Sequence, residues 1–405
     1  MCDVPALRFP EFSGEWERTT LGKIGDTFNG LTGKRGSDFG HGSPYITYKS
    51  IYDNSKIDLS RVEYVQITDD ERRKKTQNEV QYGDVFFTTS SETPNEVGMS
   101  SVLLDNIKDC YLNSFSFGYR LKSLKITMPE YMRFYLRSQI IRKKMYVLAQ
   151  GSTRFNISKG EVMGLSIKIP TAEEQNKIAV FLSLIDERIS TQNKIIEDLK
   201  KLMSAIVEML FCIQGGVLLR LGDIGSFVRG LTYSNEDITE DVNATHVIRA
   251  NNLNYGNNVN KEDVVYVNKK PTEIQILRKG DIVICMANGS SSLVGKNSYY
   301  SFDDRHSTIG AFCGVYRTSQ PLVKWLMQSQ RYKRLVYQSL QGGNGAIANL
   351  NGDDILNMTF RVVEHEKSIS ILSTLGLIEN SIAVNEKLHE LYSIQKEYLL
   401  QHLFI

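Results

Sequence analysis

The stretch Leu21-Gly22-Lys23-Ile24-Gly25 returns 200 residues later as Leu221-Gly222-Asp223-Ile224-Gly225. Gly83-Asp84-Val85 returns 197 residues later as Gly280-Asp281-Ile282. Further pairs follow in the same order, and the offset between the copies is 193 residues at the pair Asn156 and Asn349. A repeat of roughly 200 residues is much longer than a solenoid unit. The chain is therefore predicted to contain a duplicated unit of domain size.

Length and composition are those of a globular protein. The chain has 405 residues, of which 41% are hydrophobic and 23% charged. At about 150 residues per domain, this length predicts two to three domains. No run of about 18 apolar residues occurs, and the N-terminal sequence lacks the basic-then-apolar plan of a signal peptide. We expect no membrane span, and a cytoplasmic location.

Charge and cysteine usage exclude several classes of protein. The net charge of +2 gives no general basic footprint, so any surface for nucleic acid must be local. The cysteines are odd in number, widely scattered and without a Cys-x-x-Cys pair, which disfavours both zinc sites and a disulfide framework. We expect them to be small buried thiols. They are Cys2, Cys110, Cys212, Cys285 and Cys313.

Each half begins with about 150 residues of mixed pattern. Short apolar runs at 44–48, 84–88 and 166–169 lie between turn signals and predict strands. The apolar spacing from Pro129 to Ala149 predicts one helix, with a counterpart from Pro321 to Leu340. Each half is therefore expected to start with a mixed α/β domain.

Each half ends in a predicted long helix. Residues 173–211 contain no Gly or Pro, and their apolar residues alternate steps of four and three, which is a heptad seam. About 40 helical residues would span roughly 60 Å. The second helix, about 364–404, has a weaker seam. Two seam positions are polar, and their amides are expected either to meet across paired helices or to face water. The seam residues are Ile185, Ile189, Gln192, Ile196, Leu199, Met203, Ile378, Ile382 and Asn385.

Motifs for catalysis are missing from the sequence. There is no P-loop, no Gly-x-Gly-x-x-Gly after a strand, no His-Glu-x-x-His and no Asn-Pro-Pro-aromatic segment. The histidines do not fall at corresponding positions in the two halves. We therefore expect neither catalysis nor a metal site in this chain.

Polar segments recur in both halves and are candidates for reading DNA. One follows a predicted strand end (43–51 and 245–253), and the next follows the Gly-Asp element (86–92 and 283–291). Asn and Gln can recognise adenine edges, and Arg or Lys can recognise guanine. The alternatives are solvated strand ends and plain hairpin turns.

A third pair of loops lies at 150–156 and 341–349. Basic residues on the preceding predicted helices either neutralise phosphates or form a solvated face. The predicted DNA-binding residues are Lys34, Thr47, Tyr48, Lys49, Thr89, Ser90, Ser91, Arg154, Asn156, Arg249, Asn251, Asn252, Asn288, Ser290, Ser291, Lys296 and Asn344. Lys34 precedes the first of these segments, and Lys296 lies just beyond the segment 283–291.

The order of these motifs resembles a known family. The opening Pro5–Phe12 with Trp16, the repeated Leu-Gly and Gly-Asp elements, the Gln-Gly loops and the entry to the first long helix at Pro170–Gln175 are similar to specificity subunits of type I restriction–modification enzymes. Pro-Glu-Phe of the opening has no counterpart before Leu221. The resemblance covers the whole chain.

The resemblance implies an α+β fold with a pseudo-twofold internal repeat. Two similar mixed α/β target-recognition domains would be joined and separated by two long antiparallel coiled-coil helices. The implied segments are a first target-recognition domain at 1–170, a first spacer helix at 171–212, a second target-recognition domain at 213–363 and a second spacer helix at 364–405.

The resemblance also implies a function. Each domain would read one half-site of a bipartite double-stranded DNA target, and the helices would set the spacer and dock two DNA-methylation subunits. Restriction and translocase subunits would then join. The chain itself would be non-catalytic and bind no cofactor, with S-adenosylmethionine, ATP and Mg on the partners in an adenine-specific methyltransferase and endonuclease. The alternative is a coiled-coil adaptor with two protein- or glycan-binding domains.

Overall fold

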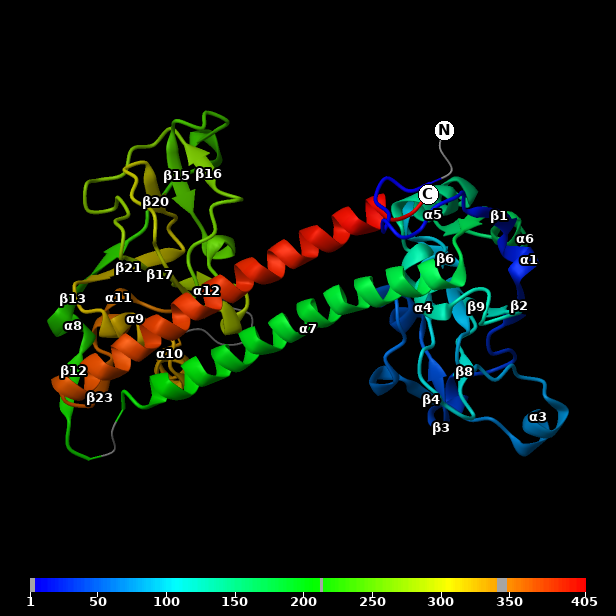
Figure 1. The fold of residues 1–405 in the computed structure, drawn as a ribbon. Helices are drawn as coiled ribbons and strands as arrows, with labels where there is room; N and C mark the ends of the chain where they lie inside the picture. Colours follow the sequence, from blue (N-terminus) through cyan, green and yellow to red (C-terminus); the bar gives the residue numbers. More distant parts are fainter. Residues whose placement is uncertain (1–3, 212–213, 341–347) are drawn as a thin grey trace. The chain divides into compact units, whose positions relative to one another are not determined.

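The structure, a computed structural model, describes residues 4–211, 214–340 and 348–405. The chain packs as two compact units, Met1–Asn193 with Lys387–Ile405 and Lys194–Glu386. The unit boundaries fall inside the long helices α7 (Ala172–Glu208) and α12 (His365–His402), so each unit contains part of each helix (Figure 1). The domain limits expected from the sequence follow chain segments instead, and they remain a prediction.

A four-stranded antiparallel sheet forms the centre of the first unit. The two hydrophobic faces of β5 are distinct, because Val85 and Phe87 belong to one buried cluster and Phe86 to another. The strands lie in the order β2 (Gly25–Asn29), β9 (Ser116–Leu121), β5 (Val85–Thr88) and β7 (Ser100–Val102).

The second unit repeats this sheet. Ile282 and Ile284 belong to one buried cluster, and Val283 and Cys285 to another, as in β5. The strands lie in the order β13 (Gly225–Arg229), β21 (Cys313–Thr318), β17 (Ile282–Cys285) and β19 (Asn297–Tyr299). The duplicated α+β fold is confirmed.

A smaller sheet follows in each unit. Its key pairing is parallel: Ile46 lies opposite Leu112 in the first unit, and Ile248 opposite Ile309 in the second. The offset between the units is 202 residues at the first strand of this pair, so it rises before it falls to 193. The first sheet contains β4 (Glu63–Val65), β3 (Phe39–Ile46) and β8 (Tyr111–Leu112), and the second contains β14 (Ile238–Thr239), β16 (Val265–Val267), β15 (Thr245–Ile248) and β20 (Ser307–Ile309).

Shorter elements complete both units. The two-stranded pairs are β1 (Glu17–Thr20) with β11 (Ser166–Ile169), β6 (Ser90–Ser91) with β10 (Phe155–Asn156), β12 (Val217–Arg220) with β23 (Thr359–Val362), and β18 (Ala287–Asn288) with β22 (Ala348–Asn349). The short helices are α1 (Leu21–Ile24), α2 (Tyr48–Asp53), α3 (Asp69–Lys74), α6 (Lys159–Gly164), α8 (Leu221–Ile224) and α11 (Gly352–Leu356).

The helix predicted over 129–149 is two helices, and so is its counterpart. Ser138 and Ser329 adopt extended backbone and start a new helix in each unit. The Ser329 hydroxyl accepts a hydrogen bond from the Tyr332 backbone N–H at 3.1 Å, which is the usual way to begin a helix. Apolar spacing is insensitive to such a break. The helices are α4 (Pro129–Tyr135) and α5 (Gln139–Leu148), then α9 (Leu322–Leu326) and α10 (Gln330–Ser339).

The repeated Leu-Gly motif has a packing role in both units. The Tyr119 hydroxyl donates to the Leu21 carbonyl at 2.8 Å, and the Tyr316 hydroxyl donates to the Leu221 carbonyl at 2.8 Å. A Cβ added at Gly25 would overlap the Tyr119 ring, so the glycine that closes the motif makes room for the tyrosine. The motif is thus repeated because each copy holds the same buried tyrosine.

The two long helices run antiparallel within each unit. In the first unit, Ile185 near the start of α7 and Leu399 near the end of α12 share one hydrophobic cluster. In the second, Ile196 of α7 clusters with Ile378 and Ile382 of α12, and Leu199, Met203 and Ile206 pack against this cluster. Ile189 is half-buried against the first unit's core.

Both polar seam residues are at least partly buried. Gln192 is 8% exposed, whereas Asn385 is half-buried and donates from Nδ2 to the Ser381 carbonyl at 2.6 Å. The Asn385 amide is thus engaged with its own helix. None of the described helices has the length and apolar content that crossing a bilayer requires.

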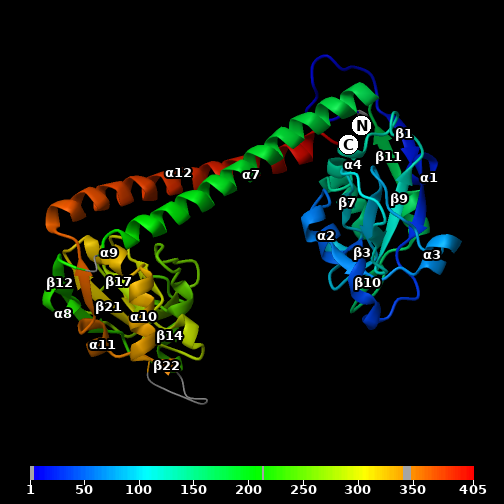
Figure 2. The same ribbon diagram turned by 90° about the horizontal axis from the view of Figure 1, so that it is seen from below.

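Residues from the end of α12 close the first unit's core. The Phe404 ring centroid lies 5.7 Å from that of Tyr131 and 5.6 Å from that of Tyr135. The Leu7 N–H donates to the His402 carbonyl at 2.9 Å. Figure 2 shows the chain's C-terminal end beside α4. This unit is therefore built from segments that are far apart in the sequence.

Candidate nucleic-acid interface

The first unit brings together predicted residues from three segments. The Tyr48 hydroxyl donates to the Ser90 carbonyl at 2.7 Å, and Asn156 pairs with Ser90 across β6 and β10. Thr89, the neighbour of Ser90, donates from Oγ1 to the Phe115 carbonyl at 2.7 Å. The predicted strand end and both predicted loops thus meet at one place.

Several of these side chains are used inside the protein. Thr47 caps α2 by accepting from the Ser50 N–H at 3.2 Å. Ser90 and Ser91 are 9% and 8% exposed, and the Ser91 hydroxyl donates to a Glu96 carboxylate oxygen at 2.8 Å. The charged candidates Lys49 and Arg154 are exposed. Among the predicted residues of the first surface, Lys49 and Arg154 are therefore the charged ones whose side chains are accessible to a ligand.

Lys34 lies apart from this surface. Its Nζ donates to a Glu71 carboxylate oxygen at 2.6 Å and to the Gln66 carbonyl at 2.7 Å, and its side chain is 8% exposed. Burial alone would raise the pKa of the Glu71 carboxyl, but hydrogen bonds, the strongest from Lys34, lower it to about 2. Lys34 therefore links α3, which contains Glu71, to Gln66, the residue that follows β4.

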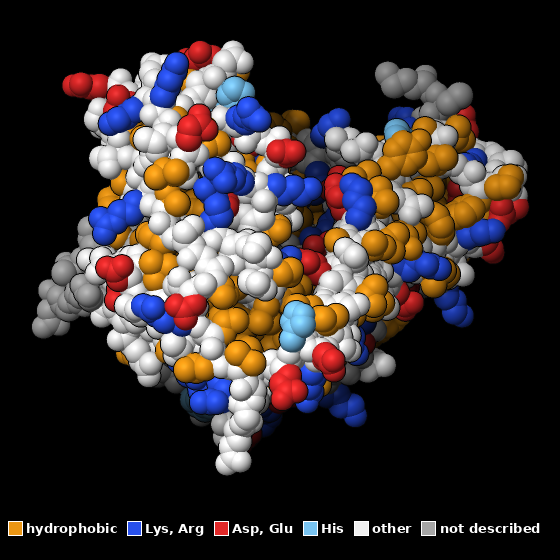
Figure 3. All heavy atoms as spheres, turned by 90° about the vertical axis from the view of Figure 1, so that its left-hand side faces the viewer, with side chains coloured by type: hydrophobic (Ala, Val, Ile, Leu, Met, Phe, Trp, Pro, Cys, Tyr) orange, Lys and Arg blue, Asp and Glu red, His pale blue; other side chains and the backbone are white. Residues whose placement is uncertain are grey.

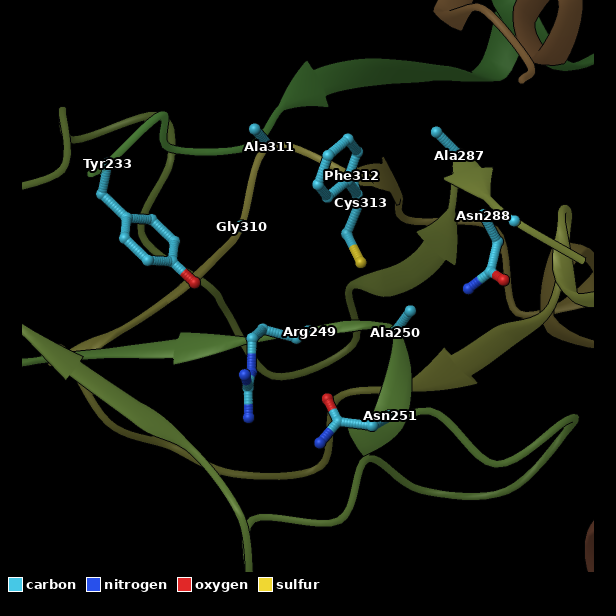
Figure 4. Close-up of a pocket in the computed structure, with 11 residues that line it drawn as sticks. Tyr233, Arg249, Ala250, Asn251, Ala287, Asn288, Gly310, Ala311, Phe312 and Cys313 are labelled. Carbon is cyan, nitrogen blue, oxygen red and sulfur yellow. The ribbon is translucent and has the colours of Figure 1, made fainter. Parts of the chain in front are cut away.

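The second unit gathers Arg249, Asn251 and Asn288 around a pocket of about 490 Å³. Figure 4 shows the Tyr233 ring on one side, Asn288 on the other and the Phe312 ring between them. The pocket combines aromatic rings, two amides and a guanidinium. Such a set can hold a flat ring with polar edges.

The polar groups of the pocket are held by Asp263. Its carboxylate accepts from Asn251 Nδ2 at 2.6 Å and from Arg249 Nη2 at 3.3 Å. Asn252 is 2% exposed; it accepts from the Arg249 N–H at 2.8 Å and donates to the Asp263 carbonyl at 2.9 Å. Asn252 therefore shapes the loop from within and is placed out of reach of a ligand.

The remaining candidates of the second unit are not all at this pocket. Asn288 Oδ1 accepts from the Ser290 N–H at 2.9 Å, so Ser290 lies next to the pocket. Ser291 and Lys296 line a separate hollow with Tyr255. Asn344 lies outside the described residues.

Sequence reasoning missed an exposed phenylalanine in each unit. Phe115 follows β8 and is 63% exposed, and Phe312 follows β20 and is 64% exposed. The Phe312 carbonyl accepts from the Met286 N–H at 2.8 Å, as the Phe115 carbonyl accepts from Thr89. Phe115 stands between two serines and Phe312 between Ala311 and Cys313, so neither neighbourhood marks an exposed ring. The two phenylalanines are 197 residues apart, the same separation as the Gly-Asp elements. This shared separation is the sequence signal that marks them as equivalent positions in the two copies.

The arginines of α4, α5 and the segment between them are expected from the sequence either to bind phosphate or to form a solvated helix face. In the structure, Arg133, Arg137 and Arg142 instead make contacts inside the first unit. Arg137 donates to the carbonyls of Ser100, Ile51, Tyr52 and Asn54, and burial lowers its pKa to about 10. Arg142 likewise donates to three carbonyls of residues 95–98, and Arg133 pairs with Asp186. Neither expectation holds for these arginines, because their guanidinium groups satisfy backbone carbonyls and a carboxylate inside the unit.

Within the described residues, charge and thiol chemistry point to no further site. On the face drawn in Figure 3, basic and acidic side chains are interspersed. In the described part of the chain no three His, Cys, Asp or Glu side chains gather in a metal-binding arrangement. Cys110, Cys285 and Cys313 are free and buried, and burial raises the pKa of Cys313 to about 12. The thiol that lines the pocket is therefore neutral at pH 7.

Two α+β units with equivalent loop surfaces, each containing part of both long helices, define a duplicated two-domain architecture. Residues 13–201 match the family model described as "Type I restriction modification DNA specificity domain". The match covers slightly less than half of the chain, and it confirms the family resemblance that the sequence predicted.

Individual relatives show the same resemblance. The chain is 29% identical over 165 residues to the EcoKI specificity subunit of Escherichia coli, covering 39% of this chain and 35% of the relative. It is 29% identical over 204 residues to a putative MjaX specificity subunit of Methanocaldococcus jannaschii, covering 50% and 46%. The alignments thus span less than half the length of these relatives. The fold is similar to the S subunit of a type I restriction–modification system from M. genitalium, with a TM-score of 0.59, 16% identity and 99% of both chains covered.

Proposed function

We propose that this chain is the DNA specificity subunit of a type I restriction–modification complex and has no catalytic activity of its own. One observation carries the proposal: the same loop surface is built twice on the same backbone, but with different side chains. The first surface presents Lys49 and Arg154, and the second presents Arg249, Asn251 and Asn288. Two related surfaces with different chemistry suit the reading of two different half-sites.

The physical argument concerns what specificity requires. Contacts to base edges carry sequence information, whereas phosphate contacts set position. Arg and Asn side chains are suited to guanine and adenine edges respectively. A net charge of +2 is compatible with this role if partner subunits neutralise much of the phosphate charge.

The partners we propose are double-stranded DNA with a bipartite site, two DNA-methylation subunits and the restriction and translocase subunits. The surfaces of the long helices favour protein partners, because they expose large apolar side chains that a solvated helix would lack. These are Val180, Leu184, Ile195 and Leu202 on α7, and Ile369, Leu377, Val384, Leu388, Leu391, Ile394 and Tyr398 on α12. S-adenosylmethionine, ATP and Mg are assigned to the partners, and the proposed location is the cytoplasm.

The alternative, an adaptor with two protein- or glycan-binding domains, receives no support from the relatives. The two proposals differ in what the assembled complex does to DNA. Co-expression of this chain with its methylation subunits, followed by sequencing of modified bases in the host genome, is the test. We expect methylated adenines in a split motif with a fixed gap. Methylation without any bipartite motif, or none at all, would count against the DNA-reading role.

A further inference from the structure

The two equivalent surfaces differ most at one position. Tyr48 and Ala250 each stand two residues after the strand end at which Ile46 or Ile248 pairs in parallel. In the first unit, the Tyr48 hydroxyl reaches across the surface to the Ser90 carbonyl at 2.7 Å. In the second, the residue at the place of Ser90 is Ala287, which lines the pocket together with Ala250. Two small side chains thus leave open the space that a tyrosine occupies in the other copy.

The open space has the chemistry of a site for a flat, polar-edged ring. Phe312 is 64% exposed at its margin, and Tyr233 lines the opposite side (Figure 4). The pocket volume of about 490 Å³ is within the range of pockets that enclose small organic ligands. An exposed aromatic ring beside a polar cavity favours stacking of a base, since every base has a π-face.

The polar side chains supply donors and acceptors for the edge of such a ring. The Asn251 and Asn288 amides each offer both kinds of group, and Arg249 offers donors only. Arg249 Nε is buried and has no hydrogen-bond partner, and it is the only such nitrogen among the described charged side chains. A buried donor of this kind gains most from a ligand acceptor, because it is not solvated in the free protein.

We propose that this pocket takes one nucleobase of the half-site read by the second unit, with the Phe312 ring against its face and Arg249, Asn251 and Asn288 against its edge. The first unit has no equivalent base pocket, because Tyr48 fills the space. Phe115, at the place of Phe312, contacts its half-site from the surface alone. This inference rests on the proposed DNA-reading function and deepens it: the two halves read DNA by different modes.

The test uses the full chain assembled with its methylation subunits. Modified-base sequencing first gives the bipartite motif, and exchange of the first unit assigns each half-site to a unit. Anisotropy titrations then compare duplexes that carry the motif with duplexes changed at one base at a time. The variants are Ala250→Tyr, which installs the first unit's residue, Ala250→Ser, which keeps the pocket open, and Phe312→Ala, which removes the stacking ring without adding bulk.

For Ala250→Tyr and Phe312→Ala we expect a loss of discrimination of about tenfold at one base of the second half-site, and an unchanged profile at the first half-site. Ala250→Ser should match the wild type. If Ala250→Tyr fails to fold by circular dichroism, Phe312→Ala decides alone. An unchanged profile for Phe312→Ala, or a loss confined to the first half-site, overturns the pocket. A wild-type complex without any bipartite preference instead overturns the proposed function, so the two failures are distinguishable.

Discussion

The Arg120 guanidinium lies 2.7 Å from the carboxylate of Asp84, which is 1% exposed. Arg317 and Asp281 make the same pair at 2.7 Å in the second unit. The aspartate of each Gly-Asp element that revealed the duplication therefore forms an ion pair. Its partner is an arginine on the neighbouring strand of the central sheet, Arg120 on β9 or Arg317 on β21. Asp84 also accepts from the Gln81 N–H at 2.9 Å, which fixes the turn that contains Gly83.

Breaking this pair should destabilise the first unit. Asp84→Ala removes a buried carboxylate and leaves Arg120 without its partner. The expected loss is about 2–3 kcal/mol, less than for a fully buried pair because Arg120 is 39% exposed. Urea unfolding of the purified chain measures the change. The control is Asp105→Ala, which breaks an exposed pair with Lys56 and should cost less than about 0.5 kcal/mol. Equal losses for the two variants would contradict the assigned role of Asp84.

The end of α12 should matter to the first unit as much as residues in its own sheet. Leu399 is 9% exposed within the first core, whereas Leu391 on the same helix is 49% exposed. Leu399→Ala should cost about 2–4 kcal/mol and Leu391→Ala less than about 1 kcal/mol. Thermal unfolding of both variants makes the comparison with matched chemistry. Similar effects for the two leucines would show that α12 does not complete this core.

Acid should weaken the first unit through Glu71. Its carboxyl has a pKa of about 2 in the folded protein against an ordinary value of 4.5, so its charge stabilises the folded state above the ordinary pKa. That contribution is lost as the pH falls from about 4.5 through 2. Stability measured by denaturant unfolding should drop across this window, and Glu71→Gln should flatten the drop. Glu92→Gln, at an exposed loop position, is the control and should leave the curve unchanged.

Exchange of recognition units should work only along the packing boundaries. Replacing residues 1–165 alone leaves Leu399, Leu403 and Phe404 against a foreign core, whereas exchanging 1–193 together with 387–405 keeps the cluster intact. We expect the second chimera to express as a folded protein and to change one half-site of the methylated motif. The first should be less stable by several degrees in Tm. A change in both half-sites would argue that the units do not read independently.

The length of the long helices gives a further test of the proposed spacer role. Four residues inserted after Leu199 should lengthen the helix by roughly 6 Å. The gap between methylated half-sites should then change, which sequencing of modified bases detects. An unchanged gap would exclude α7 as a determinant of the spacing.

Much of the fold could be predicted from the sequence because its signals are local or periodic. The Leu-Gly and Gly-Asp motifs mark places where backbone geometry or a buried ion pair tolerates few residues, so they persist in both copies. The long helices follow from a heptad pattern without Gly or Pro. The break at Ser138 was missed, because a short extended kink does not disturb apolar spacing.

The site was only partly predictable. Strand ends and loops could be named, but not whether a side chain is used internally. Lys34 and Asn252 look like free polar residues in the sequence, yet both are engaged inside their units. Phe115 and Phe312 look like core residues, yet both are exposed. Burial depends on the neighbours that the fold supplies.

The sequence by itself determined the duplication, the α+β class and the family resemblance, since each rests on order and spacing along the chain. Only the tertiary structure decided that α12 closes the first core and that Tyr48 fills a space that Ala250 leaves open. Both are contacts between segments far apart in the chain, and packing of that kind is fixed by three-dimensional proximity rather than by any local pattern.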